Sequence, residues 1–183
     1  MDLTVAADAE ISRRVRLEIW RGTTTRLVIG SRTRLGDEVK LSLRGGSLAV
    51  GDNTDIRRFG TYHVGGEIMI GSGCVMSTGL HLHCAERVTV GDLTIIGEYT
   101  TIADSRHLRT PLDVPIHHAT TTAPVAIGAN IWMGAHAVIA GGTTVGDMAF
   151  VAAGAVVTRD VPANWLVAGV PAKEIRELTV ETE

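Results

Sequence analysis

The segment VAIGANIWMGAHAVIAGGTTVGDMAFVAAGAVV, residues 125–157, carries an aliphatic side chain at every sixth position. These positions are Ile127, Met133, Ile139, Val145, Val151 and Val157. A period of six matches neither the 3.6-residue period of a helix nor the two-residue period of a strand meander. It is typical of a parallel β-helix, in which the chain winds as a solenoid and each coil stacks on the previous one.

The same spacing recurs upstream, so the solenoid is expected to cover most of the chain. The recurring positions are Ile29, Leu35, Leu41, Val50, Ile56, Tyr62, Ile70, Met76, Leu82, Val90, Ile96 and Ile102. Glycine marks successive corners, as in VGD at 50–52, 90–92 and 145–147, because it adopts backbone angles that β-branched residues resist. Three hexads make a coil of about 18 residues, which predicts six to seven coils within residues 1–162.

Two segments interrupt the repeat. Residues 103–124, ADSRHLRTPLDVPIHHATTTAP, are expected to leave the solenoid as a long loop, the kind of element on which functional residues concentrate. Residues 163–183 are expected to form a C-terminal extension with a short helix, which shields the unpaired strand edges at the end of the solenoid.

Composition limits the possible functions. The 183 residues suit one domain, and a net charge of −3 with interspersed signs argues against a nucleic-acid binder. No run approaches the roughly 20 apolar residues that span a bilayer, and no signal peptide opens the chain. The two cysteines show neither a disulfide pattern nor a CxxC spacing. We therefore expect a cytoplasmic protein with reduced thiols and no membrane span.

Three C-terminal motifs resemble those of hexapeptide-repeat acyltransferases. They are NIWMG at 130–134, AAGAVVTRDVP at 152–162 and AGVPAKEIR at 168–176. The chain is most similar to the sugar O-acetyltransferases, such as the galactoside, maltose and polysaccharide acetyltransferases. The resemblance implies an all-β, left-handed parallel β-helix that forms a homotrimer with active sites between subunits. It also implies acetyl-CoA as co-substrate, an acceptor that is a small molecule or glycan, and no metal ion.

The resemblance also indicates a catalytic base. VTVGDLTIIGEYTTIADSRH, residues 88–107, matches without gaps the family segment that ends at its catalytic histidine, which corresponds to His107. Histidine suits this role because an alcohol attacks a thioester only when its proton is accepted, and the imidazole pKa is ordinarily near 6.5. Asp104 is expected either to orient His107 or to cap a turn.

Other residues are candidates for binding the acceptor. Ser77 matches a family asparagine near the acceptor, so the contact there differs from that of the family. His81 lies one coil before His107 and faces outward, and Arg109 follows the base in a loop similar to that of the family. His117 and His118 are either further pocket residues or exposed loop residues.

The CoA site is expected along the uninterrupted six-residue repeats at 125–157. Trp132 and Gly134 lie in the NIWMG motif, where the family has an aromatic wall. Ala153, Thr158 and Arg159 match positions that line the pantetheine and phosphates. Lys173 and Arg176 match cations that meet the nucleotide phosphates.

Two alternatives remain open. A γ-class carbonic anhydrase-like enzyme would bind zinc through histidines such as His81, His83 and His107, although its paired-histidine corner motif is missing. A non-catalytic β-helix scaffold would keep the fold without needing a base.

Overall fold

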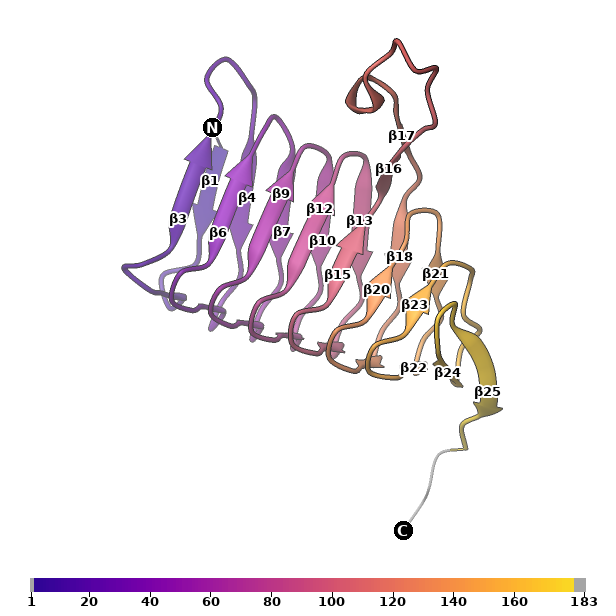
Figure 1. Cartoon of the computed structure of the whole chain (residues 1–183). Helices are drawn as coiled ribbons and strands as arrows, with labels where there is room; N and C mark the ends of the chain where they lie inside the picture. Colours follow the sequence, from indigo (N-terminus) through magenta and orange to yellow (C-terminus); the bar gives the residue numbers. More distant parts are fainter. Residues whose placement is uncertain (1, 180–183) are drawn as a thin grey trace.

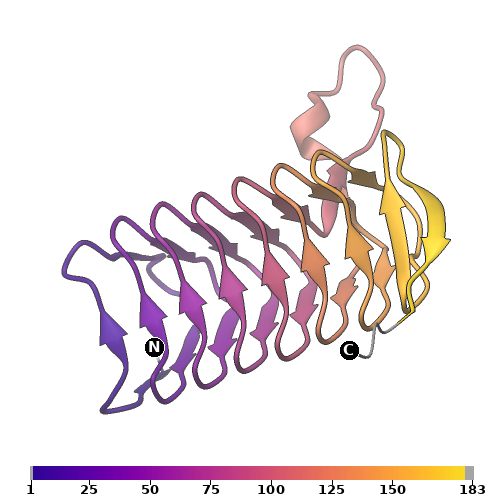
Figure 2. The same ribbon diagram turned by 90° about the horizontal axis from the view of Figure 1, so that it is seen from below.

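The computed structural model describes residues 2–179, which form a three-sided parallel β-helix (Figures 1 and 2). Sheet 1 contains β1 (Asp2–Val5), β4 (Arg26–Ile29), β7 (Ser47–Val50), β10 (Glu67–Ile70), β13 (Arg87–Val90), β18 (Val125–Ile127) and β21 (Thr144–Val145). Sheet 2 contains β2 (Glu10–Ile11), β5 (Arg34–Leu35), β8 (Asp55–Ile56), β11 (Val75–Met76), β14 (Ile95–Ile96), β19 (Trp132–Met133), β22 (Phe150–Val151), β24 (Trp165–Ala168) and β25 (Lys173–Glu177). Sheet 3 contains β3 (Arg16–Ile19), β6 (Lys40–Leu43), β9 (Thr61–Val64), β12 (His81–Cys84), β15 (Thr101–Ala103), β20 (Val138–Ile139) and β23 (Val156–Val157).

The architecture confirms the predicted all-β parallel β-helix, in agreement with the left-handed form that the resemblance implies. Within the described residues there are seven complete coils, which agrees with the predicted six to seven. β24, together with the bridge between Val161 and Val145, begins an eighth.

The aliphatic repeat forms the core of the prism. Leu41, Tyr62, Leu82 and Ile102 occupy the same register position on neighbouring strands of sheet 3. Each of them is at most 1 % exposed. Removing such stacked side chains from water is the main contribution to the stability of the solenoid.

Recurring side chains complete the corners. The aspartate of each VGD motif accepts a hydrogen bond from a backbone N–H of the preceding coil, as Asp92 does from Ser72 at 2.7 Å and Asp147 from Ala129 at 2.8 Å. A Cβ on Gly71 or Gly128 would collide with these carboxylates. Glycine is therefore needed at these corners for close approach between coils.

The predicted C-terminal helix is wrong. β24 pairs in parallel with β22, and β25 turns back to pair antiparallel with β24. This hairpin lies at the end of the stack opposite the first coil (Figure 2). Five residues are too few for a stable isolated helix, whereas pairing satisfies the backbone groups at the edge of β24. Residues 1 and 180–183 of the predicted terminal segments lie outside the described residues.

The stacked core predicts a large effect of truncation at its centre. Leu82→Ala should lower the free energy of unfolding by about 2–5 kcal/mol, because it leaves a cavity between two occupied coils. The matched control Leu112→Ala removes a fully exposed side chain and should change it by less than about 0.5 kcal/mol. Urea unfolding followed by circular dichroism measures both, and equal losses would contradict the proposed packing.

Candidate active site

The interruption at 103–124 is a β-hairpin with an extended tip. β16 (Ser105–His107) leaves the solenoid after β15 and pairs antiparallel with β17 (Thr120–Thr122), which leads back into β18. Between them lies the 3-10 turn η1 (Ile116–His118). The hairpin projects away from the stack at the corner between sheets 3 and 1 (Figure 1). The expected loop is therefore an ordered arm that presents the residues on β16.

His107 is exposed at the end of β16, opposite Thr120 in the hairpin register. The Thr120 hydroxyl lies 3.3 Å from His107 Nδ1. In the tautomer that carries a proton on Nδ1, that nitrogen donates to the hydroxyl, and the lone pair of Nε2 is available to accept a proton. The geometry thus suits His107 for general-base chemistry, with Thr120 orienting the ring.

Asp104 caps the backbone turn at residues 85–87, next to the base of the hairpin. Its carboxylate is fully buried and accepts hydrogen bonds from the backbone N–H groups of Ala85 at 2.8 Å, Glu86 at 2.7 Å and Arg87 at 2.9 Å. The structure thus places Asp104 as a turn cap, which is the second of the two expected roles. Its effect on His107 would be indirect, through the base of the hairpin.

Three histidines gather on the outer face of sheet 3. The ring of His63 lies 5.3 Å from that of His81 and 5.8 Å from that of His83, measured between centroids. We call these residues the histidine cluster. Burial, followed by the nearby histidines, lowers the pKa of His63 below 6.5, and burial, followed by His83, lowers the pKa of His81.

A serine joins the histidine cluster to the hairpin. The Ser105 hydroxyl lies 3.1 Å from His83 Nδ1. Ser105 and His107 are two residues apart on β16, so their side chains lie on the same side of that strand. His81 lies at the start of β12, opposite Thr101, and its contact with an acceptor stays a prediction.

The structure separates two other acceptor candidates. Arg109 is exposed on the arm just after His107. Ser77 is only 4 % exposed and follows β11, at the corner between sheets 2 and 3. Because β12 runs from that corner to the one where the hairpin leaves, Ser77 and His107 lie at opposite ends of a sheet 3 strand.

The outer face of sheet 2 holds an apolar groove of about 650 Å³. Trp132 is 44 % exposed there, and its ring lies 5.0 Å from that of Phe150. Arg176 from β25 lines the same groove. Two of the predicted CoA residues thus share one groove, which combines an aromatic wall with a cation.

The other predicted CoA residues lie apart from this groove. Arg159 and Lys173 line a smaller groove of about 230 Å³ at the C-terminal end. Ala153 and Thr158 are exposed on corners. Gly134 has a packing role, because a Cβ there would stand 2.5 Å from the Ala153 nitrogen.

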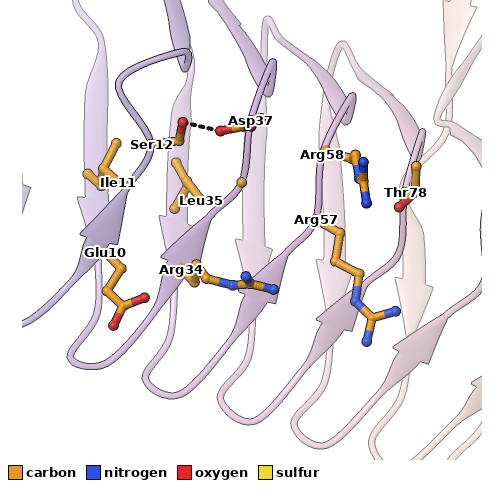
Figure 3. A pocket seen from close by; sticks show the side chains of 10 residues that line it. Glu10, Ile11, Ser12, Arg34, Leu35, Asp37, Arg57, Arg58 and Thr78 are labelled. Atoms are coloured by element: carbon orange, nitrogen blue, oxygen red, sulfur yellow. Dashed lines mark hydrogen bonds between the residues drawn. The ribbon is translucent and has the colours of Figure 1, made fainter.

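Another groove, of about 800 Å³, lies elsewhere (Figure 3). It follows the corner between sheets 2 and 3 over the first coils, and its charged side chains are largely paired. Arg34 donates two hydrogen bonds of 2.9 Å to Asp55, and Asp55 also contacts Arg57 at 3.3 Å. Ser12 donates to Asp37 at 2.5 Å. This groove shares no residue with the hairpin, so we do not place the chemistry there.

Within residues 2–179, no three His, Cys, Asp or Glu side chains are arranged to hold a metal ion. No helix in this part of the chain has the length and apolar character needed to cross a membrane.

Comparison with known proteins identifies the family. No family model matches the chain. Galactoside O-acetyltransferase from Escherichia coli (strain K12) is 33 % identical over 135 residues, which are 70 % of this chain and 63 % of that protein. The chain belongs to the hexapeptide-repeat acyltransferase family.

Further family members match other extents of the chain. A 2,3,4,5-tetrahydropyridine-2,6-dicarboxylate N-acetyltransferase from Enterococcus faecalis (strain ATCC 700802 / V583) is 49 % identical over 63 residues, 34 % of this chain and 27 % of that protein. A solved galactoside acetyltransferase in complex with coenzyme A aligns with a TM-score of 0.52 and 25 % identity, over 90 % of this chain and 64 % of that one. The chain thus spans less than two thirds of the length of each of these relatives.

Sequence reasoning missed three residues of the site. Thr120 and Ser105 lie in a segment that was expected to be a loop. Their contacts depend on the pairing of β16 with β17, and the sequence there has no periodic pattern that predicts strands. Phe150 lies 18 residues after Trp132, one coil further along, so the coil length could have placed it beside the tryptophan.

The capping role of the buried Asp104 carboxylate can be tested by its effect on the stability of the protein. Asp104→Asn replaces one acceptor oxygen with an N–H donor that faces backbone donors, and should cost about 1–3 kcal/mol of unfolding free energy. Asp113→Asn, on the exposed arm, should have little effect. Thermal unfolding measures both variants. Unchanged stability in Asp104→Asn would contradict the capping role.

Proposed function

We propose that the protein transfers an acetyl group from acetyl-CoA to a hydroxyl of a sugar, glycan or natural-product acceptor. The observation that carries this proposal is the orientation of His107, whose Nδ1 contacts Thr120 while the ring projects from the arm. Support comes from the similarity to galactoside O-acetyltransferase over 70 % of the chain. The solved relative that binds coenzyme A supports acetyl-CoA as the donor.

The proposed reaction is a direct transfer. His107 Nε2 accepts the acceptor's hydroxyl proton as the oxygen attacks the thioester carbonyl. The resulting tetrahedral intermediate collapses, its C–S bond breaks, and the CoA thiolate leaves. The proton held on Nε2 then passes to the sulfur, which returns the imidazole to its starting state.

The residues present fit coenzyme A. Trp132 and Phe150 provide an apolar wall for the pantetheine, and Arg176 provides a charge for a phosphate. Arg159 and Lys173 are further cations near the C-terminal end. Bound CoA would supply the acyl thioester, and the chain would hold it.

We further propose a cytoplasmic homotrimer. His107 projects from the corner between sheets 3 and 1, whereas the Trp132 groove lies on the outer face of sheet 2. One chain therefore presents the base and the CoA wall on different faces of the prism. A neighbouring copy that packs its sheet 2 face toward this chain's hairpin would bring them together, so the active site would be shared between subunits.

The role of His107 is tested by replacing it. His107→Ala should lower kcat for thiol release from acetyl-CoA by about 10²–10⁴-fold in a screen of glycans, amines and natural-product alcohols. Thr120→Val should lower kcat about threefold to tenfold with little change in KM, because the ring loses its orienting contact. Thr121→Val, one residue along the hairpin, is the matched control. Full turnover in His107→Ala would favour a different base or a non-catalytic scaffold.

The CoA groove gives a separate prediction. Trp132→Ala should raise KM for acetyl-CoA about tenfold, because an aromatic wall contributes more than its buried area alone. Phe59→Ala removes another half-exposed aromatic, on a corner outside the groove, and should leave this KM unchanged. Initial rates at varied acetyl-CoA decide between a binding role and a purely structural one.

A further inference from the structure

The histidine cluster has no carboxylate counterion. Among the ion pairs of residues 2–179, the carboxylates pair with arginine or lysine and never with His63, His81 or His83. His63 is half-buried, and His81 and His83 are exposed. His63 thus lies between two other imidazole rings, at 5.3 Å from His81 and 5.8 Å from His83, with no carboxylate paired to any of them.

The neighbouring strands add positive rather than negative charge. Lys40 on β6 and Arg44 just after it lower the pKa of His63 further, after the effects of burial and the two other histidines. Glu18 on β3 faces the same side but forms an ion pair of 2.9 Å with Lys40. On the other side β15 carries no titratable residue, and β16 carries Arg106 and His107. Between these two strands, the buried carboxylate of Asp104 accepts hydrogen bonds from the backbone N–H groups at 85–87. Among the described residues, no carboxylate therefore forms an ion pair with the cluster.

The cluster lies next to the hairpin that carries His107. Ser105 contacts His83 and shares a side of β16 with His107. His63, on the neighbouring strand β9, lies 5.8 Å from His83, measured between ring centroids. An acceptor that extends from His107 past Ser105 would therefore meet His83 and His63.

We propose that the histidine cluster binds an oxyanion of the acceptor, so that the preferred substrate is an acidic sugar or glycan that carries a carboxylate or a phosphate. This inference rests on the proposed acetyl transfer and specifies its substrate class. Imidazolium groups form charge-assisted hydrogen bonds to oxyanions, which are roughly twice as strong as neutral ones. Lys40 and Arg44 at the rim attract the same charge.

The binding is linked to pH. Without an anion, the lowered pKa values keep His63 and His81 mainly neutral at pH 7. A bound oxyanion stabilises the imidazolium form, so its affinity should rise as the pH falls from neutral toward the lowered pKa values of His63 and His81.

Oxyanion binding by the histidine cluster can be tested without measuring catalysis. Histidine ring resonances of the whole protein are titrated with pH in the presence of sodium glucuronate, inorganic phosphate or glucose. The two anions should raise the pKa of His63 and His81 by about one unit, and glucose should leave it unchanged. His136, which stacks on Tyr99 at 5.4 Å in another part of the solenoid, is the internal control. A response to only one anion identifies the acidic group, whereas equal shifts at His136 or none at the cluster would overturn the proposal.

Comparing KM for charged and neutral acceptors tests whether the histidine cluster sets the substrate class. The variant with His63→Gln and His81→Gln should raise KM about tenfold for methyl glucuronide or glucose 6-phosphate but less than about twofold for methyl glucoside. His136→Gln should change neither value. Equal effects on charged and neutral acceptors would refute the acidic preference while the transfer activity stands. If wild type turns over no acceptor, the proposed transfer fails, and the ring titration still decides whether the cluster binds an oxyanion.

Discussion

Everything in this molecule depends on the ladder of backbone hydrogen bonds between successive coils. Each coil donates to the next along all three sheets, as in Gly71 N–H to Val90 carbonyl at 2.8 Å and Gly91 N–H to Ile127 carbonyl at 2.8 Å. The second of these bonds spans the whole hairpin insertion. The ladder therefore continues across the interruption, and the excursion of the chain leaves the register of the solenoid intact.

The buried carboxylate of Asp104 makes this possible. At the coil from which the hairpin departs, the three backbone donors at 85–87 would otherwise lose their partners. The Asp104 side chain is fully buried, and a buried carboxylate without hydrogen-bond donors is costly. The three backbone donors satisfy it, and it satisfies them. Asp104, a position first considered for catalysis, thus supports the arm that carries the proposed base, His107.

The sequence predicted what repeats and missed what does not. Six-residue spacing located the core, and family motifs singled out His107, Trp132 and Arg176 as candidate site residues. The C-terminal hairpin and the contacts of Thr120 and Ser105 depend on pairing between segments with no periodic signal. Ser77 illustrates a second limit, because alignment gives its position on a corner but not its burial, which depends on the packing of neighbouring coils.

The hairpin leaves and re-enters the solenoid at almost the same point. The Ala123 N–H donates to the Asp104 carbonyl at 2.7 Å, and the Leu108 N–H donates to the Ala119 carbonyl at 2.8 Å. These two hydrogen bonds close the hairpin at its base and below its tip, so residues 109–118 form a separate loop. Such a tip can be lengthened, shortened or exchanged without disturbing a single coil. The coils thus form a scaffold whose structure does not depend on the hairpin tip. Grafting other tips should change which acceptors bind, with little effect on the folding of the coils.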